Sequence, residues 1–268
     1  MLRVYFLSQW YGLADEALED AIYDSQAMRN FVGIDLSSES VPDATTLLKF
    51  RHLLEREELT KAIFDQIGEH LQRRKLSLRE GTIVDATILA APSSTKNREG
   101  KRDPEMHQTR KGNAWHFGMK AHVGVDVESG LVHTVVGTAA NVADVTQSRN
   151  LLHGAEKRIH ADAGYQGAEK RPEMSDLPEN IEWLIAAKRG KIKALPDGLL
   201  KSVLGEIERR KSQVRSLVEH PFHIIKNLFK HRKVRYRGLA KNTAQLFTLF
   251  ALANLVIAGR TRRTFPAI

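Results

Sequence analysis

The pattern of apolar and polar positions divides the chain into two parts that meet near Gly81. In the first part, apolar residues recur at intervals of three and four with acidic residues between them, which is typical of amphipathic helices. Helices are predicted over 13–31, after the Ser40-Val41-Pro42-Asp43 start, and from Thr60, whose hydroxyl can cap a helix. We therefore expect the first eighty residues to form a helical region.

After Gly81 the pattern changes to that of strands. Residues 82–90 are nearly all apolar and rich in β-branched side chains, as expected of a buried strand. A hairpin is predicted next, with strands over 114–127 and 131–138 joined by a Glu128-Ser129-Gly130 turn. Two further strands are predicted over 158–161 and 181–187. Three consecutive strands, followed by alternating helix and strand, indicate an α/β fold with a mixed sheet.

The segments between these strands are polar. We predict a long loop over 93–113, a helix over 141–152, a basic loop over 188–197 and a long helix from Leu199 onward. Pro221 lacks a backbone N–H and disfavours helix at His220, so a kink or restart is expected just after Glu219.

Residues 239–257 form the most apolar run of the chain. Polar residues such as Lys241 and Asn242 interrupt it, and its uninterrupted stretch, 246–253, is too short to span a bilayer. The run therefore predicts a buried core helix, which we expect to stop at Gly259. No association with a membrane is expected.

Composition narrows the possible functions. The absence of cysteine excludes disulfides, zinc sites built on Cys and Cys nucleophiles. The N-terminus has no secretion signal, so we expect a cytoplasmic protein. No Walker-type loop, Gly-x-Ser-x-Gly motif or His-x3-His spacing is present. These absences argue against ATP use, serine-hydrolase chemistry and a histidine zinc site.

The charge is unevenly distributed along the chain. Residues 1–60 contain five Lys/Arg and eleven Asp/Glu, a net charge of −6. Because the whole chain has a net charge of +9, residues 61–268 carry a net charge of +15. A charge run is often only a solvated face, but several basic clusters around one core favour a polyanionic partner such as nucleic acid. The clusters lie at 96–111, 188–193, 209–215 and 226–237.

Three carboxylates stand out, each with a simpler alternative. Asp85 interrupts a buried strand, where a charge is costly unless it is paired, binds a metal or faces solvent. Asp162 ends a strand before a glycine turn, where turn formation alone would also explain it. Glu219 lies one helical turn from Arg215 and could form an exposed salt bridge. If the two strands and the helix are neighbours, the three side chains could hold two hard cations that act on a phosphodiester.

Further motifs give these residues a family resemblance. Arg215, three residues, Glu219, six residues and Lys226 resemble the third-carboxylate signature of bacterial insertion-sequence DDE transposases of the IS-five group. Ser212 replaces the tyrosine that opens the signature. The resemblance extends over essentially the whole chain and rests also on 84–87, 117–120, 130–133, 161–165 and 234–239.

The resemblance implies an RNase H-like catalytic core and a DNA transposase. Asp85, Asp162 and Glu219 would be the catalytic residues and would bind two Mg²⁺ ions, for which Mn²⁺ can substitute. The reaction would be nicking at the terminal inverted repeats of an element, followed by transfer of the freed 3′-hydroxyl into target DNA. A homodimer in the DNA complex and association with the bacterial nucleoid are implied. The residues that would bind DNA or support the site are Arg215, Lys226, Lys120, Arg235, Arg237 and Lys111.

The implied domain organisation has three parts. Residues 1–80 would be a helical region for DNA-end binding or dimerisation, 81–260 the RNase H-like catalytic domain, and 261–268 a basic tail. The sequence starts inside the family pattern, so we expect it to lack the usual N-terminal extension. Two alternatives follow: a truncated, inactive or regulatory DNA-binding fragment, or an RNase H-like nuclease without strand transfer.

Overall fold

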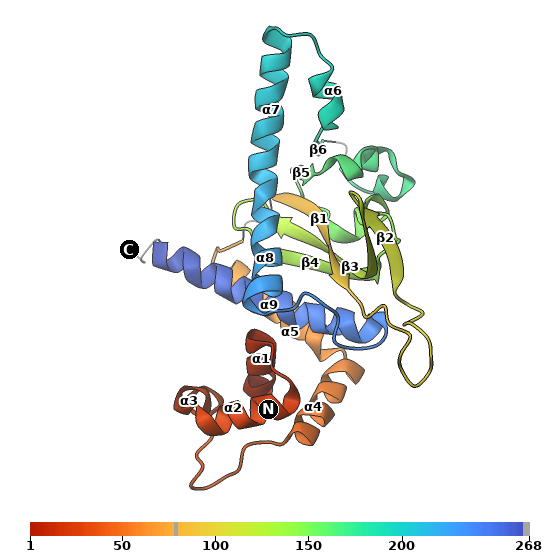
Figure 1. Ribbon diagram of the computed structural model, residues 1–268. Coiled ribbons are helices and arrows are strands. Elements are labelled where there is room, and N and C mark those ends of the chain that lie inside the picture. Colours follow the sequence, from red (N-terminus) through yellow and green to blue (C-terminus); the bar gives the residue numbers. More distant parts are fainter. Residues whose placement is uncertain (78–79, 179, 265–268) are drawn as a thin grey trace.

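The computed structural model describes residues 1–77, 80–178 and 180–264. It confirms a mixed β-sheet flanked by helices and preceded by a helical region, consistent with an RNase H-like fold (Figure 1). The N-terminal region contains α1 (Leu2–Tyr11), α2 (Asp15–Asp24), α3 (Gln26–Val32), α4 (Ala44–Arg56) and α5 (Leu59–Arg73).

This region differs from the prediction in three places. Helix α1 was not predicted, because its apolar residues form no single stripe. The predicted helix over 13–31 is two helices, because Ser25 adopts an extended backbone and its Oγ accepts the Met28 N–H at 3.3 Å, which caps α3. Helix α5 begins at Leu59, so Thr60 lies inside it and does not cap it. The predicted start before α4 is confirmed, with Asp43 as its cap.

The sheet has the order β2-β3-β1-β5-β6, and β4 also pairs with β3. β1 is antiparallel to β3, whereas β1, β5 and β6 run parallel to one another. The predicted hairpin is confirmed as β3 and β4, and the strand over 158–161 has the predicted bounds. The strands are β1 (Gly81–Ala90), β2 (His107–Lys111), β3 (Ala114–Asp126), β4 (Val132–Ala139), β5 (Arg158–Ala161) and β6 (Glu182–Ile185).

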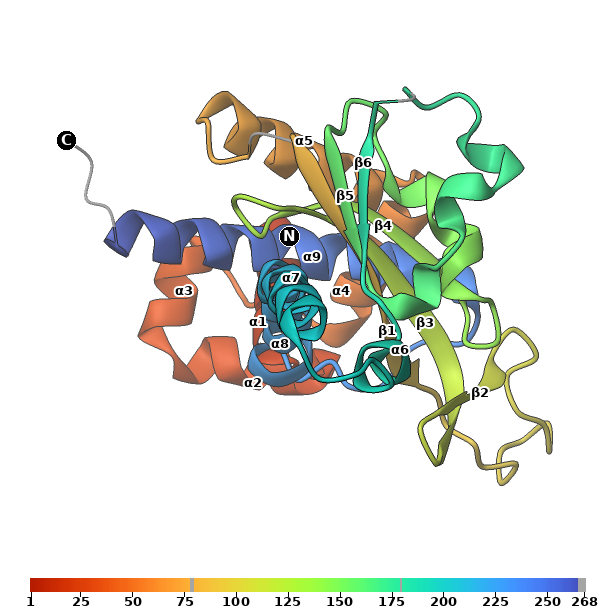
Figure 2. The same cartoon turned by 90° about the horizontal axis from the view of Figure 1, so that it is seen from above.

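The two faces of the sheet are covered by different elements (Figure 2). Alternate residues of β1 and β3, including Ile83, Leu89 and Val123, pack against α8 (Glu219–His223), α9 (Leu239–Thr264) and α5 in the main core. Val84 and Ala161 point the other way, into a second core. Short 3₁₀ helices cover that second face: η1 (Asp144–Gln147), η2 (Arg149–Leu151), η3 (Ala163–Tyr165), η4 (Ala168–Lys170) and η5 (Pro172–Met174).

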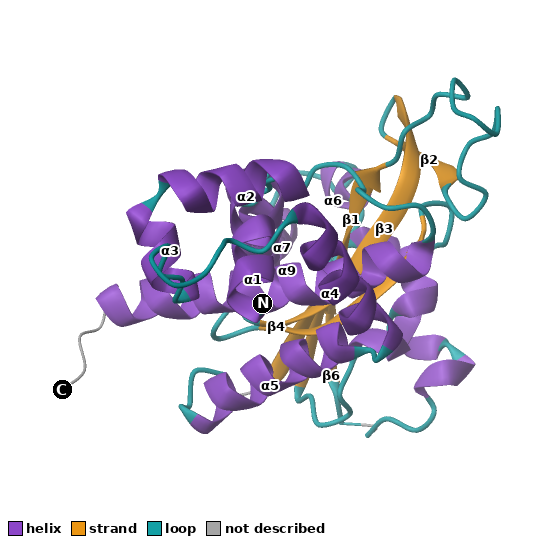
Figure 3. Cartoon of the chain, turned by 90° about the horizontal axis from the view of Figure 1, so that it is seen from below, coloured by secondary structure: helices purple, strands orange, loops and turns teal. Residues whose placement is uncertain are grey.

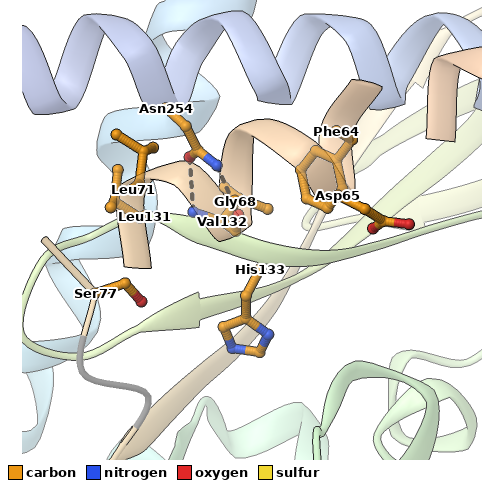
Figure 4. Close-up of a pocket in the computed structure, with 9 residues that line it drawn as sticks. All are labelled: Phe64, Asp65, Gly68, Leu71, Ser77, Leu131, Val132, His133 and Asn254. Atoms are coloured by element: carbon orange, nitrogen blue, oxygen red, sulfur yellow. Dashed lines mark hydrogen bonds between the residues drawn. The ribbon is translucent and has the colours of Figure 1, made fainter. Parts of the chain in front are cut away.

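Helix α9 is the central element of the main core and separates the sheet from α1–α4 (Figures 1 and 3). Its length and hydropathy would suffice to cross a membrane, but residues 249–253 are buried inside the protein. Asn254 fastens it to β4, since its side chain accepts the Val132 N–H at 2.8 Å and donates to the Val132 carbonyl at 2.7 Å (Figure 4). The prediction of a buried core helix is therefore confirmed.

Several local predictions were wrong. The loop over 93–113 contains β2, whose pairing with β3 is a tertiary contact that its polar sequence does not signal. Residues 141–152 form η1 and η2 instead of one helix, and the basic loop over 188–197 contains α6 (Arg189–Lys193). Helix α9 does not stop at Gly259 but continues to Thr264, into the predicted tail. Residues 265–268 of that tail lie outside the described residues.

A long helical rod carries the predicted third carboxylate. Helix α7 (Leu199–Arg215) rises away from the sheet, as Figure 1 shows, and continues through η6 (Ser216–Val218) into α8 and the π-helix η7 (Ile224–Leu228). The irregularity was predicted just after Glu219, but the 3₁₀ turn comes just before it. Pro221 then falls in the first turn of α8, where a missing N–H is tolerated.

Candidate active site

Asp85 and Asp162 lie side by side because their strands pair in register. Val84 of β1 pairs with Ala161 of β5, so the two aspartates are the next residue on each strand. Val84 and Ala161 both point into the second core. Because strand side chains alternate, Asp85 points to the opposite face, on which α8 packs, and the same alternation directs Asp162 there.

The carboxylate of Asp85 is half-buried and surrounded by charge. Burial raises the pKa of Asp85 to about 6; the Ala86 N–H, donating to Oδ1 at 2.7 Å, opposes this rise. The carboxylates of Asp162 and Glu219 raise the pKa further, while the Arg215 guanidinium lowers it. The charges of Asp162, Glu219 and Arg215 therefore all act on Asp85, although the four residues come from β1, the end of β5 and the α7–α8 rod.

The other two carboxylates are more open than Asp85. Asp162 is half-buried, and its Oδ1 accepts the Gly164 N–H at 2.8 Å, so the turn predicted as its simpler role is also present. Glu219 is exposed at the start of α8 and has no ion pair with Arg215 among the described residues. The simple salt bridge considered for Glu219 is thus not formed.

The acidic cluster is loose. Within the described ranges, no three His, Asp or Glu side chains lie close enough to hold a single metal ion. The three carboxylates nevertheless suit hard cations. Burial and the charges of Asp162 and Glu219 make the ionised form of Asp85 unfavourable when no cation is bound. A divalent cation between these oxygen atoms would relieve that repulsion.

The comparison with protein families identifies the family of the chain. Residues 76–255 match the family described as Transposase DDE domain, which covers more than half of the chain. The chain belongs to this family of DDE transposases. Residues 1–53 match a Transposase domain (DUF772). The resemblance to insertion-sequence transposases is thereby confirmed, and membership implies DNA transposition and DNA binding. No solved structure matches the chain.

Lys226 of the transposase lies against the C-terminal half of β1. Its Nζ donates to Thr87 Oγ1 at 2.6 Å and to the Ile88 carbonyl at 2.9 Å. Burial lowers the pKa of Lys226, and the positive charges of Lys111 and Arg232 lower it further. The carboxylate of Glu219 raises the pKa and partly offsets these effects. Lys226 thus lies in the electrostatic field of Glu219 as well as in that of Lys111 and Arg232.

Lys120 is not brought to this site. Its ammonium pairs with Asp144 at 2.9 Å and donates to the Val142 carbonyl at 2.8 Å, and its side chain is only 11% exposed. The buried ring of His122 lies 3.7 Å from the same carboxylate, and burial lowers the pKa of His122 to about 4. Lys120 therefore holds β3 to the 142–144 segment in this conformation.

Arg235 and Arg237 lie farther along the edge of β1. Together with the loop that follows β1 they line a pocket of about 220 Å³ that begins at Ala91 and includes Lys101 and Arg102. Arg235 also donates to the Leu13 carbonyl at 3.4 Å, and Arg237 pairs with Glu99. These two arginines are exposed but separate from the carboxylates.

The sequence interpretation did not single out Tyr165 as a site residue. Its ring is buried in the second core, and its hydroxyl lies in the electrostatic field of Asp85, Asp162 and Arg215. Its position three residues after Asp162 was the feature of the sequence that could have indicated that Tyr165 lies near the carboxylates. Two buried donors at this site, Tyr165 Oη and Arg215 Nε, have no hydrogen-bond partner within the described part of the chain.

Proposed function

We propose that the protein cleaves DNA at the ends of an insertion sequence and transfers the freed 3′ end into target DNA. The observation that carries this proposal is that Asp162, Glu219 and Arg215 all act electrostatically on Asp85, which the register of β1 with β5 sets beside Asp162. In a member of the DDE transposase family, this geometry supports phosphoryl transfer. The reaction would take place on DNA in the bacterial cytoplasm.

The proposed cofactors are two Mg²⁺ ions, with Mn²⁺ as a substitute, held by Asp85, Asp162 and Glu219. Bound there, such ions supply Lewis acidity for the attacking and leaving oxygens of a phosphodiester. The carboxylates would fix the position of the cations. Arg215 would orient the scissile phosphate from the α7–α8 rod, with its unpartnered Nε directed at an acceptor.

Both steps are in-line displacements at phosphorus. In the first, the oxygen of a water molecule forms a bond to phosphorus as the bond to the 3′ oxygen breaks, which leaves a 3′-hydroxyl. In the second, this hydroxyl attacks a target phosphodiester and displaces another 3′ oxygen. Each attacking hydroxyl loses a proton and each leaving oxygen gains one, so no covalent bond to the enzyme is needed.

The proposed DNA path runs from the carboxylates along β1. Lys226 donates to Thr87 and Ile88, Lys111 adds positive charge near Lys226, and the pocket lined by Arg235 and Arg237 begins after the strand ends. A strand rises about 3.3 Å per residue, so Asp85 and Ala91 are about 20 Å apart. A basic track of that length spans several successive phosphates of a DNA strand.

The remaining parts of the proposal concern assembly. Residues 1–80 would bind the element ends or a second copy, and 81–260 would carry out catalysis. The basic segment 261–268 begins within α9 and would add to DNA affinity. Because two element ends must be cut, the proposed form in the DNA complex is a homodimer.

Nicking of element-end DNA tests the proposal. Asp162→Asn should lower the Mg²⁺-dependent nicking rate by more than about 100-fold, since even the loss of a partner of a metal ligand costs 10–100-fold. Asp197→Asn is the matched control, because that side chain is 96% exposed and pairs with Lys201 on the surface. Equal nicking by wild type and Asp162→Asn would refute the assignment. Joining of the nicked strand to a target plasmid separates a transposase from a simple nuclease.

A further inference from the structure

Helix α7 exposes a stripe of apolar side chains. Leu199, Val203 and Ile207 follow one another at intervals of four residues, so they lie on one face of the helix, and Leu200 adjoins them at its start. Leu199 is 82% exposed and Leu200 65%, and none of the described residues of α7 is buried. The helix stands clear of the sheet (Figure 1). An exposed apolar patch of this kind marks a surface that binds another molecule.

An apolar groove opens in the N-terminal half of the molecule, between α1, α3, η7 and α9. Its volume is about 400 Å³, and nine of its ten described lining residues are apolar or aromatic, Ser25 being the exception. Tyr11, Phe31 and Leu228 line it with exposed side chains. Pockets of this size and lining receive apolar groups, so the groove is suited to aliphatic side chains such as those of the stripe.

The stripe and the groove cannot meet within one chain. Leu199 begins the helical rod and Leu228 lies at its other end, since α7 continues through η6 and α8 into η7. At about 1.5 Å per residue, the two leucines are roughly 40 Å apart along the rod. Figure 1 shows the start of α7 at the top and α1 and α3 near the bottom. The stripe can therefore reach a groove of this kind only on a second copy of the chain.

The charges of the two surfaces are opposite. Residues 188–215, which include α6 and α7, contain nine Lys/Arg and three Asp/Glu, a net charge of +6. Residues 1–60 supply seven of the ten described lining residues of the groove and carry a net charge of −6. Glu16, Asp20 and Asp24 form an exposed acidic row along α2, which ends next to the start of α3. Opposite charges of this kind favour association and set its orientation.

The basic residues near the groove leave α2 as its acidic side. Arg3 donates to the Phe31 carbonyl at 3.0 Å, and Arg29 donates to the Ile22 carbonyl at 3.1 Å, so both are engaged within their own region. Lys230, which follows Phe229, adds an exposed positive charge on the η7 side. The exposed lysines of α6 would thus face α2.

We propose that the apolar stripe of α7 docks in the apolar groove of a second copy of this chain, and that the two copies exchange this contact reciprocally. Because stripe and groove lie at opposite ends of one rod, two rods side by side in opposite directions bring each stripe to the other copy's groove. The arrangement closes with two-fold symmetry and leaves no stripe unpaired. It rests on the homodimer included in the proposed function and gives that dimer an interface.

Sedimentation equilibrium of the DNA-free protein tests the interface. Wild type should show a concentration-dependent equilibrium between monomer and dimer. The double variant Leu199→Ser/Leu200→Ser and the groove variant Tyr11→Ser should each raise the dissociation constant by more than about 10-fold, because two-fold symmetry removes each contact twice. Leu48→Ser, which changes an exposed leucine on α4 outside both surfaces, is the control and should leave the constant unchanged. A monomeric wild type would overturn the proposal.

Mixing the two defective variants separates docking from misfolding. In a mixed dimer, the intact stripe of the groove variant meets the intact groove of the stripe variant, so one of the two contacts is restored. The mixture should therefore associate more tightly than either variant alone. Association no tighter than that of the separate variants would overturn the pairing of stripe with groove, as expected if two stripes pack on each other.

Cross-linking tests the same contact without loss of the apolar surfaces. The chain has no cysteine, so a single introduced cysteine is the only thiol in each variant. Leu199→Cys mixed with Tyr11→Cys should give a covalent dimer with a bismaleimide reagent, and each variant alone should give much less. A covalent dimer formed equally well by Leu199→Cys alone, or no covalent dimer in the mixture, would contradict the proposal.

The outcomes distinguish this interface from the proposed chemistry. Association is measured without DNA or metal ion, so equal nicking by wild type and Asp162→Asn would overturn the catalytic assignment and leave the interface standing. Monomeric wild type together with loss of nicking in Asp162→Asn would overturn the interface and leave the catalytic assignment standing.

Discussion

Replacement of Asp85 by asparagine should stabilise the metal-free protein while abolishing its activity. Burial and two neighbouring carboxylates raise the pKa of Asp85 from 3.8 to about 6, so the folded protein disfavours the charged form that predominates at neutral pH. Asparagine has nearly the same shape and no charge, and its side-chain oxygen can still accept the Ala86 N–H.

The size of this effect follows from linkage. One pKa unit corresponds to 1.36 kcal/mol, so a rise of this extent destabilises the folded state by about 3 kcal/mol above pH 6. Because the side chain is only half-buried, solvent screening reduces the expected gain in Asp85→Asn to about 1–3 kcal/mol. The folded pKa is the higher one. The stability that protonated Asp85 contributes is therefore full below pH 3.8 and is lost as the pH rises through about 6.

The assay is urea unfolding in EDTA at several pH values. At pH 7.5, Asp85→Asn should have the larger free energy of unfolding, and its advantage should disappear as the pH falls from 6 to below 4. Millimolar Mg²⁺ should stabilise wild type alone and narrow the difference, since binding to the native state adds RT ln(1 + [Mg²⁺]/Kd). Asp197→Asn controls for the substitution itself. The reasoning is refuted if Asp85→Asn is no more stable than wild type at pH 7.5, or if the difference is independent of pH.

Other substitutions probe the core, a buried histidine and the basic track. Asn254→Leu should lower the free energy of unfolding by about 2–4 kcal/mol in urea melts, because it leaves the N–H and carbonyl of Val132 unpaired; an unchanged midpoint would contradict this. Burial lowers the pKa of His231 to about 4, so wild type should lose stability as the pH falls through 6.5 towards 4, and His231→Leu should lose about 2 kcal/mol less. In Lys226→Met, the slope of log binding constant against log salt concentration should fall by about the amount of one phosphate contact. A slope equal to that of wild type would show that Lys226 does not contact the DNA.

Much of the fold could be predicted from local sequence because two patterns are clear: the helical spacing of apolar residues before Gly81 and the strand pattern after it. The apolar run of β1 and the short strand β5 are bounded by sharp polar breaks, and the Glu128-Ser129-Gly130 turn fixes the hairpin between β3 and β4. Strand β2 and helix α6 escaped prediction because their sequences are polar. Strand β2 is specified by pairing with β3, a contact that its own residues do not encode.

The sequence by itself determined that Asp85 interrupts a buried strand, that Asp162 ends another, and that Glu219, Arg215 and Lys226 share a helix-like spacing. Tertiary structure alone decided which charges meet. The parallel register of β1 with β5 brings Asp85 beside Asp162, and the α7–α8 rod brings Glu219 and Arg215 within electrostatic range of Asp85.

The basic residues show the same division. Lys120 and Lys226 are both lysines on core elements, yet one is tied to Asp144 in a nearly buried ion pair and the other lies on the edge of β1 beside the carboxylates. Burial and the electrostatic field of charges distant in sequence depend on the whole fold, so they cannot be predicted from local sequence patterns.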